Sequence, residues 1–148
     1  MSNDEIEAVL AQPKGVVGHL GFEDRTNHAG HQCAVAVLTG AEGSTLPGLT
    51  IQLEVKASAA TDRCLYFFSI MLRQGQTRRR IYQLEVCPAN KRSHNGPGLV
   101  LYGPHEHVGD LAPTGVLDPE VRCGEWSNGW RWFRARCNLT AEIRTIPC

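Results

Sequence analysis

Near its centre the chain reads Cys64-Leu65-Tyr66-Phe67-Phe68-Ser69-Ile70-Met71-Leu72, an almost continuously apolar run. Such a run is typical of a central strand that is covered on both faces. The polar stretch 74–77 contains Gly75 and can turn the chain, after which residues 79–86 alternate between apolar and polar side chains. Because two strand-like runs joined by a short glycine-containing turn indicate a hairpin, we expect 64–72 and 79–86 to pair antiparallel.

Further strands are predicted on both sides of this hairpin. Residues 49–56 alternate strictly between apolar and polar side chains, which indicates a strand with one face in solvent. Residues 15–24, 33–38 and 99–102 are shorter strand candidates, and turn-forming residues separate them. The whole pattern indicates an antiparallel sheet of about five or six strands.

A helix is predicted at each end of the chain. Ser2 and Glu5 have the spacing of a capping box, and Pro13 ends the short helix that follows. A second helix is expected to have Ser127 or Asn128 as its N-cap and to run to about residue 137. Its apolar face carries Trp126, Trp130, Phe133 and Cys137. The predicted fold is therefore a single α+β domain over residues 1–148, with the sheet flanked by the N- and C-terminal helices.

Length and composition limit the class of protein. A chain of 148 residues is expected to form one domain, and 42% hydrophobic with 20% charged residues argues against a disordered chain. No apolar run approaches the ~18 residues of a membrane span. The acidic start of the sequence lacks the pattern of a secretory signal, so we expect no membrane association and a cytoplasmic location.

Charge is balanced overall but unevenly distributed. Fifteen basic residues face fifteen acidic ones, which does not suggest bulk electrostatic binding of nucleic acid. Residues 63–92 nevertheless hold seven basic residues against Glu85 alone. The triplet Arg78, Arg79 and Arg80 could form a local binding patch, or could keep a sheet edge soluble.

Six cysteines, at positions 33, 64, 87, 123, 137 and 148, contain no Cys-x-x-Cys pair. A zinc site made of cysteines alone is therefore not expected, because such sites use closely spaced thiolates. For a chain without an export signal, reduced thiols are the default. We therefore expect all six cysteines to be free.

Histidines are concentrated in one chemically suggestive segment. In an extended chain, His105 and His107 point the same way, with side chains roughly 7 Å apart, while Glu106 points to the opposite side. If the preceding loop folds back, His94 could join the pair. Three imidazoles together with Asp110 would suit a zinc site.

Two other interpretations of this segment stay open. The same imidazoles near the arginine triplet would suit general acid–base cleavage of a phosphodiester. A solvated loop rich in glycine and proline could also carry these side chains without any chemistry. His28 and His31 lie in a second polar loop, where a metal role is less expected. We predict no metal and no cofactor for the chain as a whole.

A resemblance appears at this point. It rests on three segments, which are residues 80–85, His94-Asn95-Gly96 and Gly103-Pro104-His105-Glu106-His107. These segments are similar in type and order to motifs of a family of small uncharacterised proteins encoded by prophages and other mobile elements. The likeness covers roughly residues 65–140, although Val108 stands where that family usually has an aromatic residue. The paired-histidine segment is also distantly similar to TumE-type toxins. The family implies a mobile-element setting.

Two functions follow as hypotheses. In the first, the protein is a phage or mobile-element accessory factor that binds and inhibits a bacterial host defence component, as anti-CRISPR proteins do. The alternative is a toxin-like ribonuclease of a toxin–antitoxin module, with His94, His105 and His107 as its catalytic residues. A host or phage protein is the expected partner, and the basic patch leaves nucleic acid open as a second one. The predicted partner-binding residues are Arg78, Arg79, Arg80, Lys91, Arg92 and Trp132.

Overall fold

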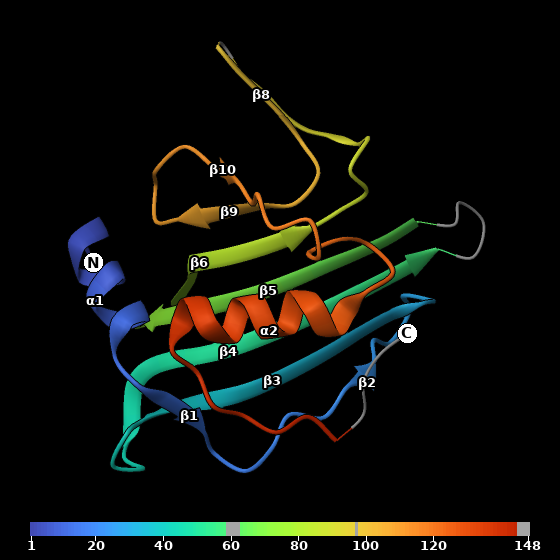
Figure 1. The fold of residues 1–148 in the computed structure, drawn as a ribbon. Coiled ribbons are helices and arrows are strands. Elements are labelled where there is room, and N and C mark those ends of the chain that lie inside the picture. Colours follow the sequence, from blue (N-terminus) through green and yellow to red (C-terminus); the bar gives the residue numbers. More distant parts are fainter. Residues whose placement is uncertain (59–62, 97, 145–148) are drawn as a thin grey trace.

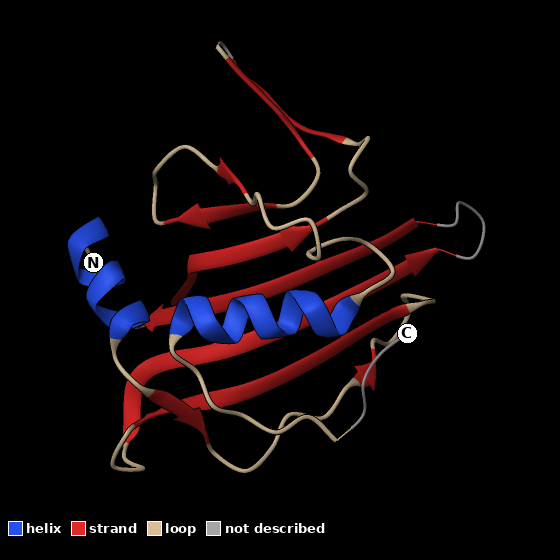
Figure 2. Cartoon of the chain, viewed as in Figure 1, coloured by secondary structure: helices blue, strands red, loops and turns tan. Residues whose placement is uncertain are grey.

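The computed structural model describes residues 1–58, 63–96 and 98–144, except for the side chains of residues 57, 58, 63, 64 and 93–96. Two helices and ten strands form the described chain (Figures 1 and 2). In chain order they are α1 (Asn3–Ala11), β1 (Lys14–Val16), β2 (Glu23–Asp24), β3 (His31–Gly40), β4 (Thr45–Ser58), β5 (Arg63–Gln74), β6 (Thr77–Val86), β7 (Arg92–Gly96), β8 (Leu99–Tyr102), β9 (His105–Val108), β10 (Thr114–Gly115) and α2 (Trp126–Cys137).

The strands form one large antiparallel sheet and one separate hairpin. The order of the sheet is β1-β3-β4-β5-β6-β9-β10, with β2 also pairing with β3, while β7 pairs only with β8. An α+β fold with an antiparallel sheet and a helix at each end is therefore confirmed. The sheet has more strands than the predicted five or six. Residues 15–24, expected as one strand, overlap the two short strands β1 and β2, and β9 and β10 were not predicted as strands. The predicted strand at 99–102 forms as β8, but it pairs with β7 outside the large sheet.

The central hairpin forms as predicted. β5 and β6 pair antiparallel, from Tyr66 opposite Val86 to Gln74 opposite Thr77. The two residues between the strands are Gly75 and Gln76, and Gly75 has a φ of +61°, in the left-handed region that tight hairpin turns require. On its two sides this pair joins β4, which has 14 residues, and β9, which has 4.

One face of the sheet packs against α2, which lies across β4 and β5 in Figure 1. The Phe68 ring is central to this contact, since its centroid lies 5.5 Å from that of Trp126, 6.4 Å from that of Trp130 and 5.6 Å from that of Phe133. Gly129 lets the helix approach closely, because a Cβ atom there would lie 3.2 Å from two carbons of the Phe68 ring. The predicted apolar helix face is thus the core contact.

The start of one helix was predicted correctly and the start of the other was not. In α1 the predicted capping box is confirmed, with Ser2 Oγ accepting a hydrogen bond from the Glu5 backbone N–H. The N-cap of α2 was predicted too late, at Ser127 or Asn128. Glu125 is the N-cap residue, without a side-chain capping hydrogen bond, and Trp126 already belongs to the helix. Trp126 is 3% exposed, so the first turn of the helix is held by packing against the core.

The prediction that β5 is covered on both faces was wrong. Tyr66, Phe68 and Ile70 face α2 and are fully buried. Phe67 and Met71 point to the opposite face, where both are only partly buried. Among the described elements no helix packs on that face, which lies behind the sheet in Figure 1.

Candidate functional site

Two predicted histidines meet an acidic residue at the end of β6. Strand β9 pairs antiparallel with β6 so that His105 lies opposite Glu85 and His107 lies opposite Gln83. Alternate residues of a strand share one face, and so both imidazoles lie on the same face as Glu85. This confirms that His105 and His107 point the same way.

The three side chains are in contact. His105 Nε2 lies 3.1 Å and His107 Nε2 lies 3.9 Å from Glu85 Oε2. The two imidazole centroids are 4.9 Å apart, in an edge-to-face arrangement. On the far side of its ring, His105 Nδ1 lies 2.9 Å from the carbonyl oxygen of Gly103. A carbonyl can only accept, so Nδ1 carries a proton and donates it.

The cluster is buried and holds opposite charges. His105 has no exposed surface, His107 is 7% exposed, and the side chain of Glu85 is 19% exposed. Burial alone would lower the pKa of His105, but hydrogen bonds to Cys87, Glu85 and Gly103 raise it to about 10. Burial likewise opposes ionisation of Glu85, yet the two histidines hold the pKa of that carboxyl well below its usual range. In the metal-free protein at neutral pH, this is an ion pair.

Glu106 takes part in a separate network on the α2 face, as its position between the two histidines predicts. Its Oε2 atom accepts hydrogen bonds from the Tyr82 hydroxyl at 2.9 Å and from Arg136 Nε at 3.1 Å. The Arg136 guanidinium also reaches Glu7 of α1. This network joins both helices to β9 and orients the strand that carries the two histidines.

The remaining predicted members of the histidine site are not placed with this cluster. The side chain of His94 lies outside the described residues, although its backbone belongs to β7. Asp110 is exposed in the turn after β9 and is not in the cluster. Sequence reasoning did not place Glu85 in the site, although the alternation in 79–86 already turned it away from the core.

The arginine triplet does not form one patch. Strand alternation turns Arg78 and Arg80 towards the face without a helix, where they donate to Thr50 Oγ1 and to Gln83 Oε1. Arg79 points to the other face and donates to the Met1 carbonyl. The triplet is also distant from the histidines. Arg80 and Glu85, which contacts them, are five residues apart on β6, and at about 3.3 Å per residue this is roughly 16 Å.

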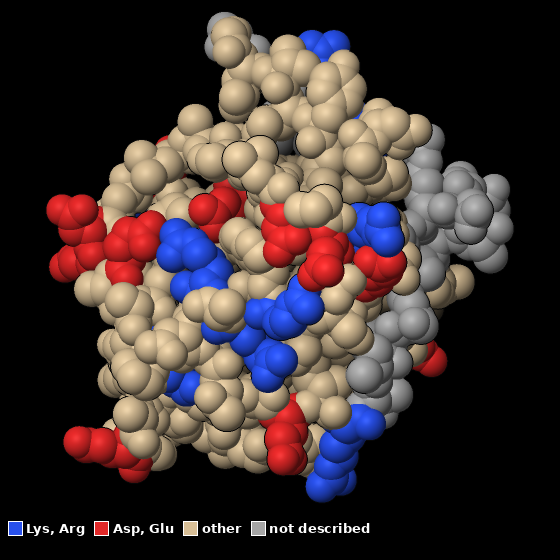
Figure 3. All heavy atoms as spheres, in the orientation of Figure 1, with Lys and Arg blue, Asp and Glu red and all other residues tan. Residues whose placement is uncertain are grey.

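The other predicted partner-binding residues lie elsewhere. Lys91 and Arg92 are exposed where β7 begins, and each has an interaction partner. Trp132 lies on α2, partly buried against the core. Figure 3 shows this α2 face, where basic and acidic side chains interleave. Arg131 pairs with Glu120 at 2.6 Å, so part of the positive charge on α2 is already compensated within the chain.

The opposite face of the sheet has a different character. We call it the uncovered face and define it by the outward-pointing residues of four strands. They include Val35 and Val37 of β3, Thr50, Gln52 and Glu54 of β4, Phe67, Ser69, Met71 and Arg73 of β5, and Arg78, Arg80, Gln83 and Glu85 of β6. Because Glu85 belongs to this face, the histidine cluster lies on it too, at the end of β6 away from the arginines. Val35 is 52% and Val37 is 42% exposed, so apolar side chains of β3 are open to solvent on this face.

Basic charge collects at one end of the uncovered face. Arg73 lies directly opposite Arg78 across the β5–β6 pair, and Arg80 follows on the same face. Their guanidinium groups donate to neutral oxygens only, namely the Gly75 carbonyl, the Thr50 hydroxyl and the Gln83 amide. Within the described part of the chain, none of these three arginines pairs with a carboxylate.

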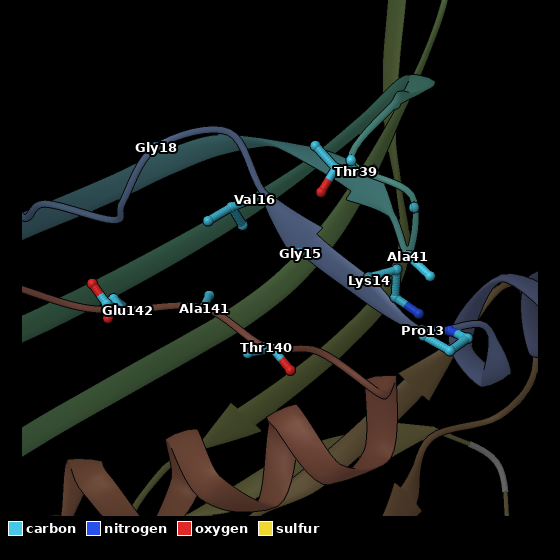
Figure 4. Close-up of a pocket in the computed structure, with 12 residues that line it drawn as sticks. Pro13, Lys14, Gly15, Val16, Gly18, Thr39, Ala41, Thr140, Ala141 and Glu142 are labelled. Carbon is cyan, nitrogen blue, oxygen red and sulfur yellow. The ribbon is translucent and has the colours of Figure 1, made fainter.

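A groove of about 530 Å³ lies at the other edge of the sheet, between β1, the end of β3 and residues 140–142 (Figure 4). Lys14 lines it, but its amino group donates to the carbonyls of Val9, Leu10 and Gln12 in and after the last turn of α1. This lysine therefore caps a helix end rather than offering its charge to a ligand.

The expectation of six free cysteines was wrong. Cys123 is disulfide-bonded, to a sulfur that lies outside the described side chains. Cys33, Cys87 and Cys137 are free. Cys123 has no closely spaced cysteine in the sequence, so spacing alone could not indicate its bond. A disulfide is more typical of an oxidising compartment than of the predicted cytoplasm.

Comparison with known proteins adds no relative. The chain matches no protein-family model, no curated protein and no solved structure. Neither of the two helices in the described residues is long and apolar enough to cross a membrane. The functional argument therefore depends on the geometry of the uncovered face and of the histidine cluster.

Proposed function

We propose that this protein acts by binding another protein through its uncovered face. The observation that carries the proposal is the combination, on one side of the sheet, of exposed valines with three arginines that pair with no carboxylate among the described residues. Apolar surface supplies most of the free energy of association, while charge complementarity selects the partner and speeds the encounter. A partner that presents carboxylates opposite Arg78 and Arg80 fits this face.

A protein fits the uncovered face better than a nucleic acid does. Proteins that bind single strands on an open sheet stack the bases on several aromatic side chains. Phe67 is the one aromatic residue among those that define the uncovered face, and the Lys56 ammonium lies 5.1 Å from its ring centroid. The balanced net charge of the chain likewise gives little bulk attraction for phosphates.

The biological setting of this binding is proposed from the resemblance to prophage-encoded proteins. In that setting the partner would be a component of a bacterial host defence, and binding would inhibit it in the cytoplasm. The disulfide bond of Cys123 weighs against that compartment, so the state of this cysteine in the native cell bears directly on the proposed setting.

The ribonuclease alternative has less support from the geometry. A general acid or base must reach its substrate, and His105 has no exposed surface. Arg78 and Arg80, the side chains expected to hold a phosphate, lie too far along β6 to act on the same group. We therefore expect expression of the wild-type chain alone to leave bacterial growth and cellular RNA unchanged. Growth arrest that His105→Ala relieves would instead support RNA cleavage.

Reversing charge on the uncovered face tests the binding proposal. The wild-type chain is used to capture its partner from host lysate, and the Kd is then measured with the purified partner. The double variant Arg78→Glu/Arg80→Glu should weaken binding on the order of 100-fold, because like charges facing each other across an interface cost several kcal/mol.

Arg131→Glu is the matched control for this measurement. It reverses an exposed arginine on the α2 face, where Arg131 pairs with Glu120. This control should bind the partner as the wild type does. An equal loss of affinity in both proteins, or wild-type affinity in the double variant, would place the binding surface elsewhere.

A further inference from the structure

The most convergent group of ligand atoms in the described residues is the cluster of Glu85, His105 and His107. One atom from each side chain lies within 4.8 Å of the others. A tetrahedral zinc ion with bonds of ~2.0–2.1 Å places its ligand atoms about 3.4 Å apart. The separations of 3.1 Å and 3.9 Å from Glu85 Oε2 to the two Nε2 atoms are close to that value.

The backbone holds these side chains in place independently of any ion. Glu85 and His105 are direct partners in the β6–β9 register, and His107 follows two residues later on the same face. On the opposite side of β9, Glu106 is fixed by Tyr82 and Arg136. The ligands would therefore come from two paired strands rather than from a mobile loop, so binding an ion would cost little ordering entropy.

The outer contacts of His105 also suit metal binding. Imidazoles that ligate zinc through Nε2 commonly donate Nδ1–H to a backbone carbonyl, which fixes the tautomer and the ring orientation. His105 makes this contact with Gly103, over a distance of 2.9 Å. Its Nε2 atom is thereby directed at Glu85 and away from solvent, since the side chain has no exposed surface.

We propose that Glu85, His105 and His107 form a binding site for one zinc ion. Two imidazoles and one carboxylate are an established ligand set for zinc in proteins. A tetrahedral ion would keep its fourth position for a ligand from outside the cluster. This site goes beyond partner binding. It lies on the uncovered face as well, but at the opposite end of β6 from Arg78 and Arg80.

Direct metal analysis tests the proposal on the untagged wild-type chain. After removal of metals and titration with zinc alone, we expect one ion per chain and a higher Tm, because a ligand that binds only the folded state stabilises it. Losing an outer-shell partner typically lowers metal affinity 10–100-fold. Loss of a ligand, in Glu85→Gln or His107→Ala, should therefore lower zinc affinity by at least about 100-fold.

His28→Ala is the matched control, since His28 is an exposed histidine outside the cluster. It should bind one zinc ion with wild-type affinity. If His107→Ala does not fold, the titration uses His107→Gln instead, because glutamine is close to histidine in size. The zinc stoichiometry of the wild-type chain is measured without any variant. Less than one zinc per chain in the wild type would overturn the site. The proposed site would also be overturned if Glu85→Gln and His107→Gln kept their zinc, or if His28→Ala lost it.

Discussion

Replacement of Trp130 by alanine is expected to lower the free energy of unfolding by about 3–5 kcal/mol, the usual cost of truncating a large buried aromatic side chain. Trp130 is 7% exposed, and its ring stacks on those of Trp126 and Phe133 at centroid distances of 5.8 Å and 6.0 Å. Phe68 of β5 lies under the same ring. Truncation would thus leave a cavity between α2 and the sheet.

Chemical denaturation followed by circular dichroism measures this change. Trp132→Ala is the control, because Trp132 lies on the same helix but is only partly buried, and its truncation should cost clearly less. A loss below about 1 kcal/mol for Trp130→Ala, the range of many ordinary surface changes, would mean that α2 does not pack on the sheet through this face.

Replacement of Cys123 by serine should lower the free energy of unfolding by about 2–4 kcal/mol, because a disulfide restricts the unfolded chain. Peptide mapping under non-reducing conditions should find Cys123 in a bridge and should identify its partner. Alkylation of denatured protein should label Cys33, Cys87 and Cys137, which are free in the structure.

Cys33→Ser is the control for the cysteine experiment, since Cys33 is free and only half-buried. It should change stability much less than Cys123→Ser. If all six cysteines of freshly purified, unreduced protein are alkylated, the disulfide does not form under native conditions. The reduced state expected for a cytoplasmic chain would then hold.

Local sequence patterns predicted the elements that have a clear periodicity. The alternation in 49–56 and 79–86 and the helical spacing of Trp126, Trp130 and Phe133 correspond to β4, β6 and the core face of α2. The same alternation could also have separated Arg79 from its two neighbours, because successive side chains of a strand point to opposite faces. The prediction of one patch was wrong because Arg79 points away from Arg78 and Arg80.

The errors concern contacts that no local pattern contains. Phe67 and Met71 are as apolar as the core residues of β5, so composition could not show that their face of the sheet lacks a helix. The partner of His105 is Glu85, and their contact depends on the register between β6 and β9. That register is set across a long connection, which includes the β7–β8 hairpin. Disulfide connectivity is equally non-local, and cysteine spacing does not determine it.

Site-specific photo-crosslinking tests the central claim, that the uncovered face is the protein-binding surface. A photoreactive phenylalanine analogue is placed at Val37, which is 42% exposed on that face, or at Leu117, which is 94% exposed in a loop after β10. Both proteins are irradiated with the purified partner. We expect a covalent product from position 37 and none from position 117. A product from position 117 alone would contradict the claim.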